Sequence, residues 1–167
     1  SPVRISLFSR LTFGYLVSFL LAAGASAFTV WQLRHFSGIT ASILEIDNRV
    51  LDFEKALADL LLSQNRYERK FAIAKDESLF KQYLRLKEDF DGQLKKALAL
   101  NNPLARKSLD EVARDYQSYD DLVRREAQLL RANRVYPQAR YKDDKDNLVD
   151  AMLASLEKLR VDQQAAT

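Results

Sequence analysis

Apolar side chains recur at alternating spacings of three and four residues after Arg34, which is the repeat of a helix with one apolar stripe. A single polar residue, Gln64, interrupts this series, and no proline does. The series predicts a helix over about residues 33–74. Its inward positions are expected to be Phe36, Ile39, Ile43, Ile46, Val50, Phe53, Leu57, Leu60, Gln64, Tyr67 and Phe71.

Shorter series of the same kind predict three more amphipathic helices, over about residues 77–100, 103–134 and 142–164. Asp76 and Asn102 precede two of these helices as N-cap residues, and Pro103 suits a first helical turn. The expected inward positions are Leu79, Tyr83, Leu86, Phe90, Leu94, Ala97, Ala105, Leu109, Val112, Tyr116, Tyr119, Val123, Glu126, Leu130, Val149, Met152, Leu156 and Leu159.

Four amphipathic helices with short connections bury their stripes by packing against one another. The chain has only 4 Gly and 3 Pro among its 167 residues, so it offers few turns. We therefore expect an all-α fold, an antiparallel up-down four-helix bundle over residues 32–167. The first helix is predicted to be much longer than the second, and the fourth would have to continue beyond Thr167 to cover it. This geometry suggests that a second membrane crossing follows.

The region before the bundle has the pattern of a membrane span. Residues 11–31 carry no charge, and they are enough to cross about 30 Å of hydrocarbon as a helix. Arg4 and Arg10 precede this run, which favours a cytoplasmic location for the N-terminal residues 1–10. Nothing between Trp31 and Phe36 would end a helix. We therefore expect a transmembrane helix that continues into the first bundle helix.

The same region also has the features of a cleaved secretion signal. Ala25-Ser26-Ala27 is a small-x-small cleavage pattern, and it follows a short apolar core over residues 11–24. The apolar run continues through Phe28 and Trp31, past the cleavage point, which favours the anchor. The alternative is a secreted helical binding or scaffold protein.

Small residues recur every four positions in the span, at Gly14, Ser18, Ala22 and Ser26. In a helix they form one stripe, and such stripes allow two membrane helices to approach closely. We interpret this stripe as a possible homodimer seam. The alternative is that small residues are simply common in membrane spans.

Charge and composition exclude several classes of function. The net charge is +3, and its 26 basic and 23 acidic residues are interleaved, whereas a nucleic-acid surface needs segregated basic residues. The chain has no Cys and a single His, His35, so it offers no thiol chemistry and no two-histidine metal site. We expect no catalytic residue, no metal and no cofactor in this region.

The candidate ligand-binding residues are the polar side chains at inward helix positions. Gln64 and Glu126 are expected in a similar layer of the bundle. The residues expected near them are Arg66, Tyr67, Tyr119 and Arg124. This layer is interpreted either as a small polar pocket or as a buried polar layer that fixes helix register.

Two stretches resemble a known family. The stretch RYERKFAIAKDESLFKQYLRLKEDFDGQL, residues 66–94, resembles the first hairpin of CHASE-type and chemoreceptor-type four-helix sensor modules. The stretch RISLFSRLTFGYLVSFLL, residues 4–21, resembles the first membrane helix of bacterial sensor histidine kinases. Residues 74–76, Ala-Lys-Asp, depart from the Thr-Gly-Asp turn that is common in these modules.

The resemblance implies a periplasmic sensor domain of the bacterial inner membrane, with an unknown extracytoplasmic ligand. A HAMP linker and a histidine kinase core would follow inside the cell, with a cytoplasmic response regulator as partner. His35 is not a credible phosphoacceptor, because no acidic residue follows it and it lies at the membrane edge. A chemotaxis receptor with the same input domain is the alternative output.

Overall fold

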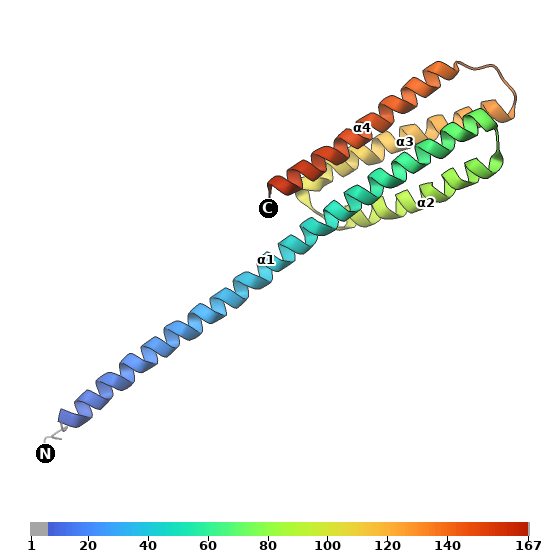
Figure 1. Cartoon of the computed structure of the whole chain (residues 1–167). Coiled ribbons are helices and arrows are strands. Elements are labelled where there is room, and N and C mark those ends of the chain that lie inside the picture. Colours follow the sequence, from blue (N-terminus) through green and yellow to red (C-terminus); the bar gives the residue numbers. More distant parts are fainter. Residues whose placement is uncertain (1–6, 167) are drawn as a thin grey trace. The chain divides into compact units, whose positions relative to one another are not determined.

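A computed structural model describes the backbone of residues 7–166 and the side chains of residues 12–32 and 45–166. The described residues form four helices and no strand (Figure 1), which confirms the all-α fold. The chain divides into two units, residues 1–44 and 45–167. The helices are α1 (Leu7–Ala74), α2 (Glu77–Ala99), α3 (Pro103–Arg131) and α4 (Gln138–Ala165).

The first unit contains one segment that is long and apolar enough to span a membrane. This segment, Thr12–Gln32, has 21 residues, and none of it is buried within the chain. A signal sequence near an N-terminus can meet the same criteria of length and hydropathy. The hydroxyls of Ser26 and Thr29 donate to the carbonyl oxygens of Ala22 and Ala25, at 2.9 and 2.8 Å. Both polar groups are therefore satisfied inside the helix, as an apolar environment requires.

Contacts at the helix ends of the second unit establish an antiparallel bundle. The ring of Phe71, near the end of α1, lies 5.1 Å from the ring of Phe80, near the start of α2. Arg131 at the end of α3 pairs with Glu77 at the start of α2, with nitrogen to oxygen at 2.7 Å. Asn102, just before α3, bonds to Gln163 near the end of α4. Each helix therefore runs opposite to the next, as expected from the short connections.

The core lies between residues 50–74 of α1 and the other three helices. It is rich in aromatic rings, and Phe90 of α2 stacks on Tyr116 of α3 at a centroid distance of 4.0 Å. The largest side chains that are almost completely buried are Tyr83, Tyr119, Phe90, Leu57, Leu61, Met152, Leu156, Leu159, Gln64, Gln163 and Val112. Two glutamines in this set show that the core contains polar groups.

Both predicted N-caps are confirmed. The Asp76 carboxylate accepts from the backbone N–H of Ser78 at 2.9 Å. The Asn102 side chain accepts from the N–H groups of Leu104 and Ala105 at 3.0 and 3.2 Å, and it also bonds to the buried Gln163 of α4. These caps satisfy donors that a helix leaves unpaired at its start.

Two helix ends differ from the prediction. The third helix ends at Arg131 rather than at residue 134, because Asn133 adopts a left-handed conformation, with φ of 51°. The Arg134 N–H then bonds back to the Leu129 carbonyl at 3.0 Å. The fourth helix begins at Gln138 rather than at residue 142, directly after Pro137. Pro137 occupies the N-cap position and makes no side-chain cap; its missing N–H is tolerated there, because the first N–H groups of a helix have no partner within it.

The inward stripe of α1 also differs from the prediction. Leu61 and Glu68 are buried, whereas Leu60 and Tyr67 are only partly buried. Three consecutive leucines, residues 60–62, satisfy either phase of the repeat, so spacing alone selected the wrong neighbour. The predicted positions Phe36, Ile39 and Ile43 lie outside the residues whose side chains are described.

Replacement of the α3 cap tests how the bundle is closed at this end. Asn102→Ala should lower the free energy of unfolding by about 1 kcal/mol for the lost cap. A further loss of about 1–3 kcal/mol is expected, because the buried Gln163 side chain loses its partner. Urea unfolding of the chain in lipid nanodiscs measures this loss. Asp76→Ala is the control, since Asp76 caps α2 without an inter-helix bond, and an equal or larger loss for it would contradict the prediction.

Candidate functional site

A buried ion triad joins three helices of the bundle. The Lys145 ammonium of α4 lies 2.5 Å from Glu68 Oε2 of α1 and 2.5 Å from Glu126 Oε2 of α3. The exposed fractions of Glu68, Glu126 and Lys145 are only 3%, 6% and 4%. One cation is therefore shared by two carboxylates in a site that water hardly reaches, and the group has a net charge of −1 when all three are ionised.

The two carboxylates of the triad differ in their surroundings. Glu126 Oε1 accepts a hydrogen bond from the Tyr136 hydroxyl at 2.8 Å, while its Oε2 makes the ion pair with Lys145 without a hydrogen bond. Glu68 has only Lys145, and its Oε1 is buried without a hydrogen-bond partner. Burial raises the pKa of Glu68 above its usual value, the Lys145 ammonium opposes this shift, and the nearby Glu126 adds to it. The surroundings of Glu68 therefore favour its protonated form.

A cavity of about 320 Å³ adjoins the triad. Glu126, Lys145 and the Tyr136 side chain line it, together with the apolar Ala72 and Ile73 of α1. Its other lining residues are Arg69, Gln138 and Lys142. Asp146 pairs with both Arg69 and Lys142, so one carboxylate is shared by two cations at the edge of this cavity.

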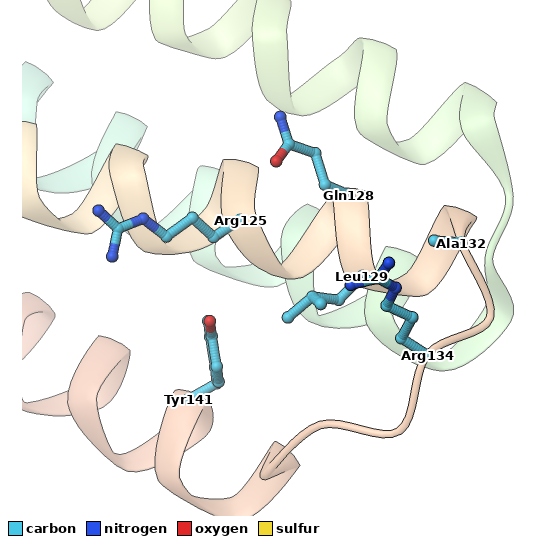
Figure 2. Close-up of a pocket in the computed structure, with 6 residues that line it drawn as sticks. All are labelled: Arg125, Gln128, Leu129, Ala132, Arg134 and Tyr141. Carbon is cyan, nitrogen blue, oxygen red and sulfur yellow. The ribbon is translucent and has the colours of Figure 1, made fainter.

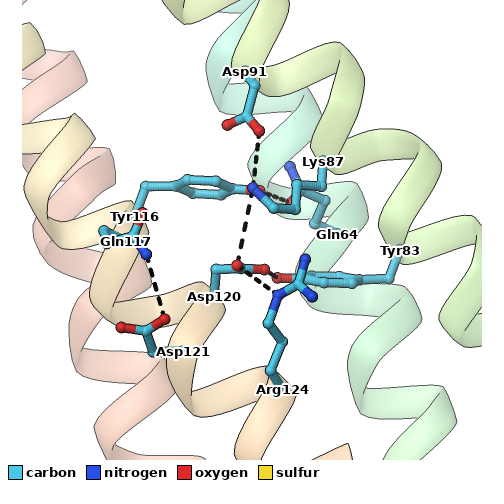
Figure 3. Close-up of polar contacts among 9 residues, drawn as sticks. All are labelled: Gln64, Tyr83, Lys87, Asp91, Tyr116, Gln117, Asp120, Asp121 and Arg124. Carbon is cyan, nitrogen blue, oxygen red and sulfur yellow. Dashed lines mark hydrogen bonds and ion pairs between the residues drawn. The ribbon is translucent and has the colours of Figure 1, made fainter.

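A second polar cluster lies between α2 and α3 (Figure 3). The Tyr83 hydroxyl donates to Asp120 Oδ1 at 2.8 Å, and Arg124 Nε donates to Asp120 Oδ2 at 2.9 Å. Asp120 is buried, whereas the Arg124 side chain is about half exposed. In the same view, the Tyr116 hydroxyl donates to the Gln64 carbonyl oxygen of α1. Burial raises the pKa values of Tyr83 and Tyr116, so both phenols stay neutral.

A second concavity, of about 400 Å³, lies between the end of α3 and the start of α4 (Figure 2). It is lined by Arg125, Gln128, Leu129, Ala132, Arg134 and Tyr141. In Figure 2 the Arg125 and Gln128 side chains extend in different directions. The polar groups of the triad converge on one point, whereas those of this concavity do not.

The structure divides the predicted ligand-binding layer between the first two clusters. Gln64 and Arg124 belong to the cluster around Tyr116 and Asp120, whereas Glu126 belongs to the triad. Gln64 bonds to Tyr116, ten residues before Glu126 on α3, so the two residues do not share a layer.

The other three predicted residues are not part of either hydrogen-bonded cluster. Tyr119 is fully buried, but its hydroxyl has no hydrogen-bond partner. Arg66 is exposed, and it lines a shallow groove along α1 with Leu62 and Arg69. Tyr67 is partly buried, and the Lys70 ammonium lies 5.9 Å from the centre of its ring.

The sequence analysis missed three residues that carry the polar core: Glu68, Lys145 and Asp120. The signal for Glu68 was present, because it lies four residues after Gln64 and three before Phe71. Lys145 likewise lies four residues before Val149, at the start of the α4 stripe. Both residues are charged, so a search for apolar inward positions does not include them. Asp120 carried the same signal as Glu68, because it lies four residues after Tyr116 and three before Val123.

Comparison with known proteins leaves the site to be interpreted from its own chemistry. No protein family, characterised protein or solved structure matches this chain. Within the residues whose side chains are described, no group of three His, Asp or Glu side chains is arranged to hold a metal ion. What the described site offers is ion pairing and hydrogen bonding between helices.

Removal of the shared ammonium tests the triad. Lys145→Met leaves two carboxylates buried without a cation, so the free energy of unfolding at pH 7 should fall by about 3–5 kcal/mol. The control Lys142→Met, one turn earlier on α4, removes a largely exposed partner of Asp146 and should cost less than about 1 kcal/mol. Urea unfolding in nanodiscs measures both values, and equal losses would show that Lys145 is no more important than a surface lysine.

Proposed function

We propose that this chain is the signal-input part of a membrane-anchored receptor, a transmembrane sensor histidine kinase. The observation that carries the proposal is that one helix, α1, contains both the candidate membrane span and the residues that hold the bundle's polar core. A stimulus that changes the packing around Gln64 or Glu68 then acts on the same element that enters the membrane.

The contacts of α1 favour such a role. Gln64 bonds to α3, while Glu68 and Arg69 both pair with α4. A ligand or ion that binds one packing of these side chains better than another shifts the equilibrium between the two. Displacements of about 1–2 Å are typical of helix shifts in signalling proteins. We propose that α1 passes such a displacement to output domains across the membrane.

The remaining parts of the proposal concern partners. In a homodimer, the small residues Gly14, Ser18, Ala22 and Ser26 would form the seam between two spans. The output would be a histidine kinase acting on a response regulator, or a chemotaxis signalling core. A secreted protein with a cleaved signal is the second candidate, which the Ala25-Ser26-Ala27 pattern favours.

The fate of the N-terminal segment in the native host separates the anchor from the signal. For an anchored receptor, the protein should stay in the membrane pellet after alkaline carbonate washing, because its span is embedded in lipid. N-terminal peptide mapping by mass spectrometry should also find residues 12–27 in the mature chain. A soluble periplasmic chain that begins at Phe28 would contradict the anchor and support the secreted form.

Coupling through α1 can be tested with two variants of equal length. Residues 37–40 are replaced by four glycines in one variant and by four alanines in the other, because glycine weakens a helix and alanine supports it. Glu68→Gln, which alters the triad, should change the phosphorylation of the full-length protein in native membranes in the alanine background only. An equal change in the glycine background would contradict transmission through this helix.

A further inference from the structure

We propose that the triad of Glu68, Lys145 and Glu126 is a proton-binding site, so that the stimulus of this input module is acidification outside the membrane. Proton uptake by Glu68 would release α1 from its buried ion pair with α4. The signalling part of this inference rests on the proposed function, whereas proton binding by the site does not.

The charge balance of the triad favours one bound proton. Two carboxylates and one ammonium carry a net charge of −1 when all are ionised, and one proton makes the buried group neutral. Isolated charge is costly in a site that water hardly reaches. Glu126 is contacted by two groups, the Lys145 ammonium at Oε2 and the Tyr136 hydroxyl at Oε1, whereas Glu68 is contacted by Lys145 alone and its Oε1 has no donor. Glu68 is therefore the group that takes the proton.

The groups around Glu68 come from several elements. The charged groups that act on it are Arg69 of α1, Glu126 of α3 and Lys145 of α4. The Tyr119 and Tyr136 hydroxyls lie within its electrostatic reach, and burial keeps both phenols neutral by raising their pKa values. Among the described residues, α2 adds no charged group to this set. Arg69 is shared with Asp146 at the surface, so Lys145 is the one buried cation that opposes protonation.

A route for the proton exists beside the triad. The cavity of about 320 Å³ is lined by Glu126 and Lys145, so it reaches two of the three charged groups from solvent. A proton entering there needs to pass only within the triad to reach Glu68. The buried site can therefore respond to external pH without unfolding of the bundle.

Protonation changes which helices the triad joins. A neutral Glu68 no longer forms an ion pair, so Lys145 is left with Glu126 as its anionic partner. The buried link between α3 and α4 persists, while the buried link between α1 and α4 loses its charge. The helix that is freed is the one that contains the candidate membrane span.

The first test is a titration of the purified 167-residue chain in nanodiscs. Carbon NMR of labelled glutamate carboxyls follows each Glu from pH 3 to 8, and Glu68→Gln identifies the Glu68 signal by its loss. We expect Glu68 to titrate above about 4.3, the usual value for this side chain. A midpoint at or below that value overturns the proton site.

Thermal unfolding across the same pH range is a second, independent test of the proton site. The folded state holds the Glu68 proton more tightly than the unfolded state, so this group's contribution to stability is full below its usual pKa and is lost as pH rises through the raised value. The melting temperature of Glu68→Gln should therefore match the wild type near pH 4 and exceed it near pH 7. A variant that melts below the wild type by a growing margin as pH rises would overturn the site.

Glu77→Gln is the matched control. Glu77 also pairs with a cation on another helix, but it is exposed, and its bond to Arg131 lowers its pKa. Its contribution is present above its usual pKa and is lost as pH falls, so this variant should melt below the wild type near pH 7 and approach it near pH 4. The two variants should thus deviate from the wild type in opposite directions.

Signalling is tested separately, with the full-length protein in its native membrane. Lowering the external pH from 7 to 5 should change phosphorylation at least twofold in the wild type and in Glu77→Gln, and should leave Glu68→Gln unchanged. If the titration is as expected but phosphorylation ignores pH in every variant, the signalling part of the inference fails and the proton site stands. An ordinary Glu68 titration overturns the site whatever the phosphorylation does.

Discussion

In the second unit, one ammonium is shared by two carboxylates from different helices, and much of the bundle's arrangement depends on that shared charge. Lys145 can meet Glu68 and Glu126 only if α1, α3 and α4 adopt one register, because all three side chains are buried. Shifting α1 by one residue would leave a buried charge without a partner, at a cost of several kcal/mol. Apolar stripes alone tolerate more than one phase, so the ions select among packings that hydrophobic burial leaves nearly equal.

The second polar cluster complements this selection at another position along α3. Asp120 is held by Tyr83 of α2 and Arg124 of α3, while Tyr116 bonds to Gln64 of α1. Between them, the two clusters link α1, α2, α3 and α4 through side-chain bonds. Replacing such groups by apolar ones of similar size often costs little stability. Their value is better sought in specifying one packing and in allowing that packing to be changed by a proton or a ligand.

The first unit follows a simpler constraint. Its segment Thr12–Gln32 exposes large apolar side chains and satisfies the Ser26 and Thr29 hydroxyls within the helix. That combination suits lipid, where no water completes a missing bond. In the proposed receptor, the composition of the span is therefore set by the lipid around it, whereas the packing of the bundle is set by its buried charges.

Local signals in the sequence determined the four helices and the starts of α2 and α3. Asp76 and Asn102 cap helices through bonds to their own neighbours, and an uncharged run can be recognised as a candidate span without reference to the rest of the chain. The tertiary structure alone decided the phase of α1, the separation of Gln64 from Glu126, and the pairing of Glu68 with Lys145, 77 residues apart. A charged residue at an inward helix position is stable only if an oppositely charged side chain pairs with it. In this bundle the paired residue lies on another helix, and a local sequence pattern does not identify it.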